Sequence, residues 1–133
     1  MAVFISRSPE QTIEFGIRYA KNLNKNDVIV LNGEMGAGKT VFSKGVAMGL
    51  GITEEVLSPT YAYMNDYNGK LFHFDCYRLK NGGQAEALGL CDYFYAGGVC
   101  LVEWAENIKE VLPANRKTVT IRKTAEGREI TYD

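Results

Sequence analysis

One segment, residues 33–40, constrains the fold of this chain more than any other. It reads Gly33-Glu34-Met35-Gly36-Ala37-Gly38-Lys39-Thr40 and fits the pattern G-x-x-x-x-G-K-[ST]. Before it, residues 28–31 form an apolar, β-branched run that is typical of a buried strand. After it, residues 41–50 place apolar side chains at helical spacing. A strand, a glycine-rich turn and a helix in this order predict an α/β fold built around a strand–loop–helix unit.

The glycine-rich segment predicts a phosphate-binding loop, the P-loop. Glycines let the backbone wrap closely around an anion, and the N-terminus of the following helix adds partial positive charge. Lys39 is expected to reach the β- and γ-phosphates of a nucleotide, and the Thr40 hydroxyl to bind Mg²⁺. The predicted nucleotide contacts in this region are Glu34, Met35, Gly36, Ala37, Gly38, Lys39, Thr40 and Val41. Whether Glu34 faces Mg²⁺ or solvent stays open.

The predicted cofactors are ATP and Mg²⁺. Residues 24–27 spell N-K-x-D, the pattern with which GTPases read guanine. Guanine readers place this pattern after a strand well downstream of the P-loop, whereas here it precedes the P-loop strand and is typical of a turn. Adenine is therefore the default base, although no residue identifies it.

A P-loop NTPase needs an acid at the end of a neighbouring strand. Two segments provide one: residues 71–75 end in Asp75, and residues 99–103 end in Glu103. The second is apolar on both faces, as in buried parallel strands, whereas the first alternates and predicts a half-exposed strand. We therefore expect Glu103 and Thr40 to hold Mg²⁺, and Asp75 to contact it through water or to orient the attacking water. The predicted catalytic residues are Lys39, Glu103 and Asp75.

Three further residues have more than one interpretation. Thr60 lies between the P-loop helix and the next strand, where nucleotide-sensing switches sit, and is either such a switch or an ordinary turn residue. Trp104 follows Glu103 and lies either near the nucleotide or a partner, or in the core. His73 is the only histidine, and a lone histidine on a strand is more often structural than catalytic.

The remaining pattern completes a single P-loop NTPase-like domain over residues 1–133. A strand is expected at 3–5, a helix from Ser8-Pro9 to about residue 23, and short helices at 84–88 and 106–112. Hairpins are expected around Asn68-Gly69 and between 118–123 and 128–132. The predicted class is α/β: a mixed, mostly parallel sheet with antiparallel hairpin additions and helices on both faces. Its ligand should lie at the carboxyl ends of the strands.

Composition narrows the function classes. The formal net charge is −1, which gives no strong electrostatic attraction to nucleic acid. The three cysteines, Cys76, Cys91 and Cys100, match no zinc or C-x-x-C pattern and indicate thiols in a reducing compartment. The sequence contains no recognisable signal peptide and no stretch of membrane-spanning length. We therefore expect a cytoplasmic protein that does not contact a membrane.

The chain closely resembles the TsaE family of small bacterial P-loop ATPases. After the P-loop, four motifs occur in the order typical of this family: Ser58-Pro59-Thr60-Tyr61, the run HFDCYRL at 73–79, the run LGLCDYF at 88–94, and Val102-Glu103-Trp104. The resemblance extends from about residue 8 to residue 112. It implies that Lys39, Thr40, Thr60, Asp75, Glu103 and Trp104 occupy functional positions.

The resemblance also implies an activity. TsaE proteins are weak ATPases alone and work with TsaB and TsaD, which transfer a threonylcarbamoyl group to adenosine 37 of tRNAs that read codons beginning with A. The expected partner is therefore the complex of TsaB and TsaD, with tRNA contacted only indirectly. This chain departs from the family at residues 80–84, which contain glycine and no acid instead of being rich in proline and acids.

Two other functions remain possible on the residues alone. A small-molecule P-loop kinase is the first, although such kinases usually have an arginine-rich lid and this chain has no arginine cluster. A non-catalytic ATP-sensing module is the second. Its interface would use aromatic side chains, which are enriched at contact cores. The candidates are Tyr61, Tyr63, Tyr67, Tyr93, Phe94 and Tyr95.

Overall fold

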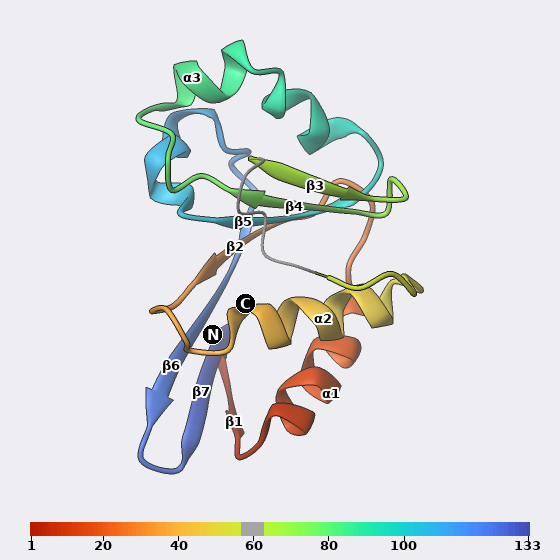
Figure 1. The fold of residues 1–133 in the computed structure, drawn as a ribbon, viewed down its shortest axis with the longest axis vertical. Helices are drawn as coiled ribbons and strands as arrows, with labels where there is room; N and C mark the ends of the chain where they lie inside the picture. Colours follow the sequence, from red (N-terminus) through yellow and green to blue (C-terminus); the bar gives the residue numbers. More distant parts are fainter. Residues whose placement is uncertain (57–62) are drawn as a thin grey trace. The chain divides into compact units, whose positions relative to one another are not determined.

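The structure is a computed structural model that describes residues 1–56 and 63–133 (Figure 1). Strands and helices alternate along much of the chain. With η denoting 3₁₀ helices, the elements are β1 (Ala2–Ser6), α1 (Pro9–Ala20), β2 (Val28–Asn32), α2 (Lys39–Gly49), β3 (Met64–Tyr67), β4 (Leu71–Asp75), α3 (Gly82–Ala87), η1 (Leu90–Tyr95), β5 (Val99–Glu103), η2 (Ala105–Val111), β6 (Lys117–Thr124) and β7 (Gly127–Tyr132).

The strands form a mixed sheet in the order β1-β7-β6-β2-β5-β4-β3. β4 and β5 run parallel, whereas the pairs β1–β7, β6–β7 and β3–β4 are antiparallel. The mixed α/β class is confirmed, but the parallel part is smaller than the mostly parallel sheet we expected. The reason is that β3–β4 and β6–β7 are joined by tight turns, and only a longer crossover can bring two strands into parallel pairing.

The chain divides into two compact units. Unit 1 contains Met1–Leu23, Leu31–Leu57 and Thr118–Asp133, and unit 2 contains Asn24–Val30 and Ser58–Lys117. β2 therefore begins in unit 2 and ends in unit 1. Each unit has its own packing and is described separately.

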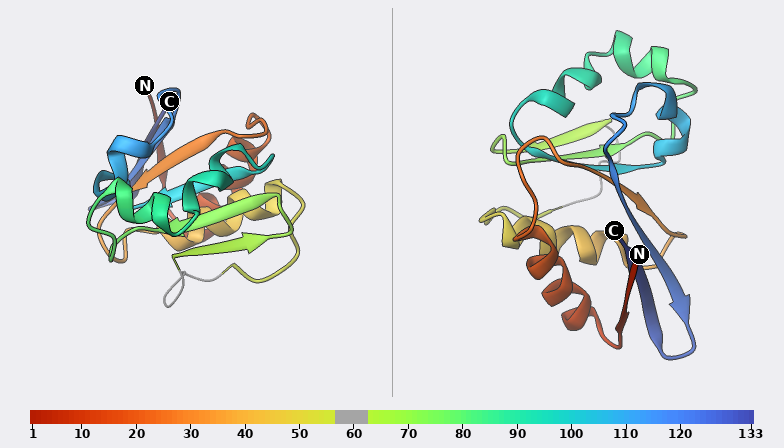
Figure 2. Two further views of the ribbon diagram at one scale, coloured as in Figure 1. Left: turned by 90° about the horizontal axis from the view of Figure 1, so that it is seen from above. Right: turned by 180° about the vertical axis from the view of Figure 1, so that it is seen from behind.

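In unit 1, α1 and α2 lie side by side (Figures 1 and 2). Ser8 caps α1 by accepting a hydrogen bond from the Gln11 backbone, with Pro9 at the first helical position, as the sequence predicts. The helices approach so closely that a Cβ atom on Gly45 would lie 2.4 Å from the carbonyl oxygen of Ile13. Stacked and edge-on aromatic rings fill the space around α1: Phe4, Phe15, Tyr19, Phe42 and Tyr132.

In unit 2, helical residues 82–95 cover one face of β4 and β5 (Figure 1). The core includes Phe72, Phe74, Phe94, Val102 and Ile108. Residues 71–74 are all buried, so the prediction that β4 is half-exposed is wrong. Alternation indicated one solvated face, but β4 lies between β3 and β5 in the sheet and its side chains are buried on both faces.

Local turn chemistry explains the loops of unit 2. Asn68 and Gly69 have φ angles of 58° and 69°, which is the left-handed geometry that a type I′ hairpin turn requires, and the predicted hairpin is confirmed. The Asp27 carboxylate accepts a hydrogen bond from the Asn24 backbone at 2.8 Å, so the N-K-x-D segment is a turn.

Two helices differ from the prediction. The helix at Leu90–Tyr95 was not predicted, and the helix at Ala105–Val111 is a 3₁₀ helix. Across residues 1–56 and 63–133, none of the helices has the length and apolar character needed to cross a bilayer.

Candidate functional site

The P-loop of unit 1 adopts an anion-binding geometry. α2 begins at Lys39, and its N-cap is Gly38 with φ 112°, a left-handed conformation that favours glycine. Gly36 is also left-handed, with φ 79°. A glycine N-cap supplies no side-chain hydrogen bond to the helix start. The partial positive charge at this end of the helix favours phosphate.

The P-loop residues differ in exposure. Glu34, Met35 and Gly36 form the exposed tip of the loop, and Met35 is 93% exposed. Ala37 is buried, with its backbone N–H bonded to the Glu34 carbonyl at 3.0 Å. The start of α2 is half-buried and contains Lys39, Thr40 and Val41. In P-loop NTPases the lysine and the threonine of the motif act from this position.

Arg128 on β7 holds the outer side of the P-loop. Its Nε atom donates to the Ala37 carbonyl at 2.8 Å, and a terminal nitrogen donates to the Gly36 carbonyl at 3.4 Å. When a loop turns its backbone N–H groups inward, its backbone carbonyls point outward. Those carbonyls need hydrogen-bond donors when they are buried. Lys123 on the same hairpin adds a second cation, with Nζ 3.3 Å from where a Cβ atom on Gly36 would lie. These contacts could not be predicted from the sequence, because Arg128 belongs to no motif.

A cavity of about 140 Å³ adjoins the P-loop within unit 1. Gly38 and Val41, two of the predicted nucleotide contacts, form part of its wall. The other lining residues come from the end of β1, the start of α1 with the two residues before it, and β7, and were not predicted: Ser6, Arg7, Ser8, Pro9, Thr12, Gly127 and Arg128. Ser6 and Thr12 are buried and share a 2.6 Å hydrogen bond, so the cavity has a polar side. No sequence pattern connects these segments to the P-loop.

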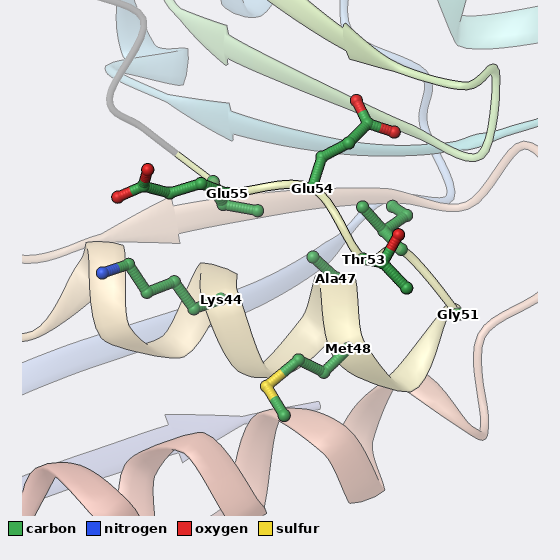
Figure 3. Close-up of a pocket in the computed structure, with 9 residues that line it drawn as sticks. Lys44, Ala47, Met48, Gly51, Thr53, Glu54 and Glu55 are labelled. Atoms are coloured by element: carbon green, nitrogen blue, oxygen red, sulfur yellow. The ribbon is translucent and has the colours of Figure 1, made fainter.

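A larger cavity, of about 600 Å³, lies along the second half of α2 (Figure 3). Its lining residues are Lys44, Ala47, Met48, Gly51, Ile52, Thr53, Glu54, Glu55 and Val56. The set contains none of the residues predicted to bind the nucleotide. Cavity size alone would therefore point away from the P-loop, and the chemistry of the motif decides the candidate site.

The two candidate acids lie opposite each other in unit 2. β4 and β5 pair in parallel register with Asp75 opposite Glu103, so both carboxylates follow the carboxyl ends of their strands. The Asp75 carboxylate accepts a hydrogen bond from the Tyr77 backbone at 3.0 Å. Glu103 contacts a buried imidazole: Oε2 lies 2.6 Å from Nε2 of His73. The sequence predicted the two acids at strand ends but assigned His73 no partner.

Trp104 lies at the surface of unit 2 immediately after Glu103. Its side chain is 41% exposed, so the alternative that placed it in the core is wrong. Its φ angle of 57° is left-handed, which ends β5 abruptly. The indole meets the Tyr77 ring edge-on at 4.8 Å. Thr60, the candidate switch residue, lies outside the described residues.

The predicted ligands fit Mg²⁺ better than a metal that needs three or more protein side chains around it. Within the part of the chain that the structure describes, no group of three or more histidine, cysteine, aspartate or glutamate side chains could hold a metal ion. Mg²⁺ does not need such a cage, because it keeps several waters and takes one or two protein ligands together with phosphate oxygens. Each unit contains one predicted ligand of this kind, the Thr40 hydroxyl in unit 1 and the Glu103 carboxylate in unit 2.

The cysteines have the properties of inert thiols. Burial raises the pKa of the Cys76 thiol to about 12, with the charge of Asp75 adding to the effect. Burial also raises the pKa of Cys100 to about 12 and raises that of Cys91. Thiols that stay protonated at neutral pH are poor nucleophiles and poor metal ligands.

Comparisons with known proteins identify a family. Residues 6–130 match the model of the TsaE family, described as threonylcarbamoyl adenosine biosynthesis protein TsaE. A Bacillus subtilis protein named tRNA threonylcarbamoyladenosine biosynthesis protein TsaE is 44% identical over 94% of this chain and 80% of its own length. A Treponema pallidum protein of the same name is 41% identical over 96% of both chains. The crystal structure of Bacillus subtilis YdiB superposes with a TM-score of 0.84 at 39% identity, covering 98% of this chain and 83% of that one.

Proposed function

Since this chain belongs to the TsaE family of threonylcarbamoyl adenosine biosynthesis proteins, we propose that it is a Mg²⁺-dependent ATPase that supports threonylcarbamoyl modification of tRNA. The observation that carries the proposal is the P-loop itself. Gly38 caps α2 without a side chain, and Arg128 holds the carbonyls of Gly36 and Ala37; both features support binding of a polyphosphate at this loop.

The proposed roles follow from chemistry and location. Lys39 neutralises the β- and γ-phosphates, and Thr40 supplies a hydroxyl to Mg²⁺. Glu103 supports the metal, and Asp75 contacts it through water or orients the attacking water. The nucleoside lies toward the cavity beside Gly38. The buried Ser6 and Thr12 hydroxyls on its polar side bond to each other and to the Ser8 carbonyl, so they shape the wall and do not bind the ligand. That cavity is too small to enclose a nucleotide, so the remainder of the ligand stays outside it.

We further propose that the ATPase is weak alone and works with TsaB and TsaD in the cytoplasm. The family name of the relatives supports the pathway, and the resemblance of the ordered motifs supports the partners. The net charge of −1 favours indirect contact with tRNA, because a protein that binds tRNA by itself usually presents a strongly basic surface.

Exposed aromatic side chains favour one alternative, an ATP-sensing module whose nucleotide only gates a protein interface. Tyr77 and Tyr95 are 63% and 72% exposed, and Trp104 adjoins Tyr77. Such residues are enriched at interfaces. In this alternative hydrolysis is dispensable, so a hydrolysis-deficient protein would retain full cellular function.

The test is Mg²⁺-dependent ATP turnover by the purified protein, alone and with TsaB and TsaD. Lys39→Ala should abolish ATP binding, whereas Glu103→Gln should bind ATP but turn it over roughly 100-fold more slowly. Lys44→Ala is the matched control: it removes a lysine from the same helix, outside the P-loop, and should leave both properties unchanged.

Three outcomes would contradict the proposal. Wild-type turnover in both the Lys39 and the Glu103 variants would place the site elsewhere. Transfer of phosphate to a nucleoside or sugar acceptor would identify a kinase. Full complementation of a deletion strain by Glu103→Gln would favour the sensing module.

A further inference from the structure

The only histidine of the chain is fully buried against the candidate metal-linked acid. The His73 side chain is 0% exposed, and its Nε2 atom lies 2.6 Å from Oε2 of Glu103, whose side chain is 12% exposed. The register of the two strands explains this contact. His73 pairs with Leu101, and Glu103 is two residues further along β5 and therefore on the same face of the sheet.

The contact restricts the Glu103 carboxylate. A glutamate side chain rotates freely about its last torsion when nothing holds it. Because His73 engages Oε2, the plane of the carboxylate is fixed, and with it the direction in which Oε1 points. The histidine is itself held in the interior of β4, between the buried Phe72 and Phe74, so it provides a rigid reference.

The hydrogen-bonding chemistry favours one tautomer of His73. An ionised carboxylate only accepts hydrogen bonds, so Nε2 must carry the proton that joins the two groups. Among the described residues, Nδ1 of His73 is buried without a hydrogen-bond partner. A bare lone pair at Nδ1 is the less costly alternative to a buried, unsatisfied N–H group.

We propose that His73 is a positioning residue for ATP hydrolysis: its Nε2–H group orients Glu103 toward the Mg²⁺–nucleotide. This inference rests on the proposed function, because it requires Glu103 to be the acid that supports Mg²⁺. Removing a residue that orients a metal-linked side chain typically lowers metal affinity or activity by roughly 10- to 100-fold.

The experiment compares His73→Leu, which keeps the bulk without a donor, with His73→Gln, whose amide places an N–H near the position of Nε2. For His73→Leu we expect ATP binding in EDTA within about 2-fold of wild type, because the P-loop is untouched. We expect kcat to fall roughly 10- to 100-fold with little change in KM. His73→Gln should recover most of the lost kcat. Phe72→Leu is the matched control, because it perturbs packing at the neighbouring position of β4 without touching Glu103.

A second measurement does not depend on activity. Trp104 is the only tryptophan of the chain and follows Glu103 directly, so its fluorescence reports on this end of β5. Adding Mg²⁺ to the ATP-bound protein should produce a fluorescence change whose midpoint rises roughly 10-fold or more in His73→Leu and returns toward wild type in His73→Gln.

Several results would overturn the inference. One is wild-type kcat and Mg²⁺ midpoint in His73→Leu while Glu103→Gln is inactive; another is equal losses in His73→Gln and His73→Leu. Equal losses in Phe72→Leu would indicate a merely structural role. If His73→Leu does not fold, ¹⁵N NMR of wild-type His73 decides. A protonated Nε2 whose shift changes in Glu103→Gln supports the contact, and a ring protonated at Nδ1 alone overturns it. Wild-type turnover in Glu103→Gln would instead overturn the proposed function, and the ¹⁵N shifts would still report on the pair.

Discussion

Replacing Arg128 by alanine should weaken ATP binding by roughly 10- to 100-fold. The perturbation removes a 2.8 Å hydrogen bond from a guanidinium to the Ala37 carbonyl and a longer one, 3.4 Å, to the Gly36 carbonyl. Hydrogen bonds from charged groups contribute about 1.5–3 kcal/mol, and each 1.4 kcal/mol corresponds to a factor of about 10 in an equilibrium constant. The shorter bond accounts for the estimate, because the longer one lies near the limit of useful geometry.

The cost should appear in nucleotide affinity for a structural reason. Ala37 is 0% exposed, so its carbonyl loses its donor without ready access to bulk water. The P-loop can relieve this by leaving its nucleotide-ready shape. Binding then has to restore that shape, and the apparent affinity falls in proportion to the population that was lost.

The assay is isothermal titration of ATP in EDTA, which separates the loop from Mg²⁺ effects. Arg128→Lys keeps the charge but not the planar fork, so it should lie between wild type and Arg128→Ala. Arg122→Ala is the matched control. It removes an arginine from the same hairpin, where Arg122 pairs with Glu129 at the surface, and such exposed pairs contribute about 0–1 kcal/mol. Binding within 2-fold of wild type in folded Arg128→Ala, or equal weakening in Arg122→Ala, would refute the reasoning.

Three further results are expected. Gly45→Ala should lower the free energy of unfolding by about 1–3 kcal/mol in urea titrations, because the new methyl group would lie 2.4 Å from the Ile13 carbonyl oxygen. In the native protein at pH 8, a thiol reagent followed by mass spectrometry should label Cys91 before Cys76 or Cys100, which are buried. The folded-state pKa of about 12 at Cys76 and Cys100 favours the folded state below pH 9, and urea midpoints should fall as pH rises from 9 toward 12.

Short-range chemistry made much of the fold predictable from the sequence. Ser8-Pro9 marked the start of α1, and Asn68-Gly69 marked a type I′ turn, because each pattern satisfies a local backbone requirement. The P-loop glycines are of the same kind, since Gly36 and Gly38 adopt left-handed conformations that other residues rarely occupy.

Burial by tertiary neighbours was less predictable. β4 alternates in polarity and yet is buried on both faces, because the polar position is occupied by His73, which satisfies its Nε2 atom with Glu103. A polar residue in a strand indicates solvent only when it has no partner inside, and the sequence does not show that partner 30 positions away. Strand burial therefore does not rank Glu103 above Asp75. The two strands differ in the strand order, in which β5 and not β4 neighbours β2.

The same limit explains why the sequence predicts groups that would face a ligand and misses the groups that would support them. A P-loop motif is readable because its glycines, Lys39 and Thr40 must be adjacent in the chain to surround one phosphate. The donor that holds the loop carries no such constraint. Arg128 donates to the Ala37 carbonyl although the two residues are 91 positions apart in the sequence. Any strand that passes close to this carbonyl could supply an equivalent cation. A relative that keeps the motif but has lost this arginine should therefore carry a compensating donor on another element, or bind ATP more weakly. Exchanging β7 residues between two such relatives, and measuring ATP affinity, would distinguish these cases.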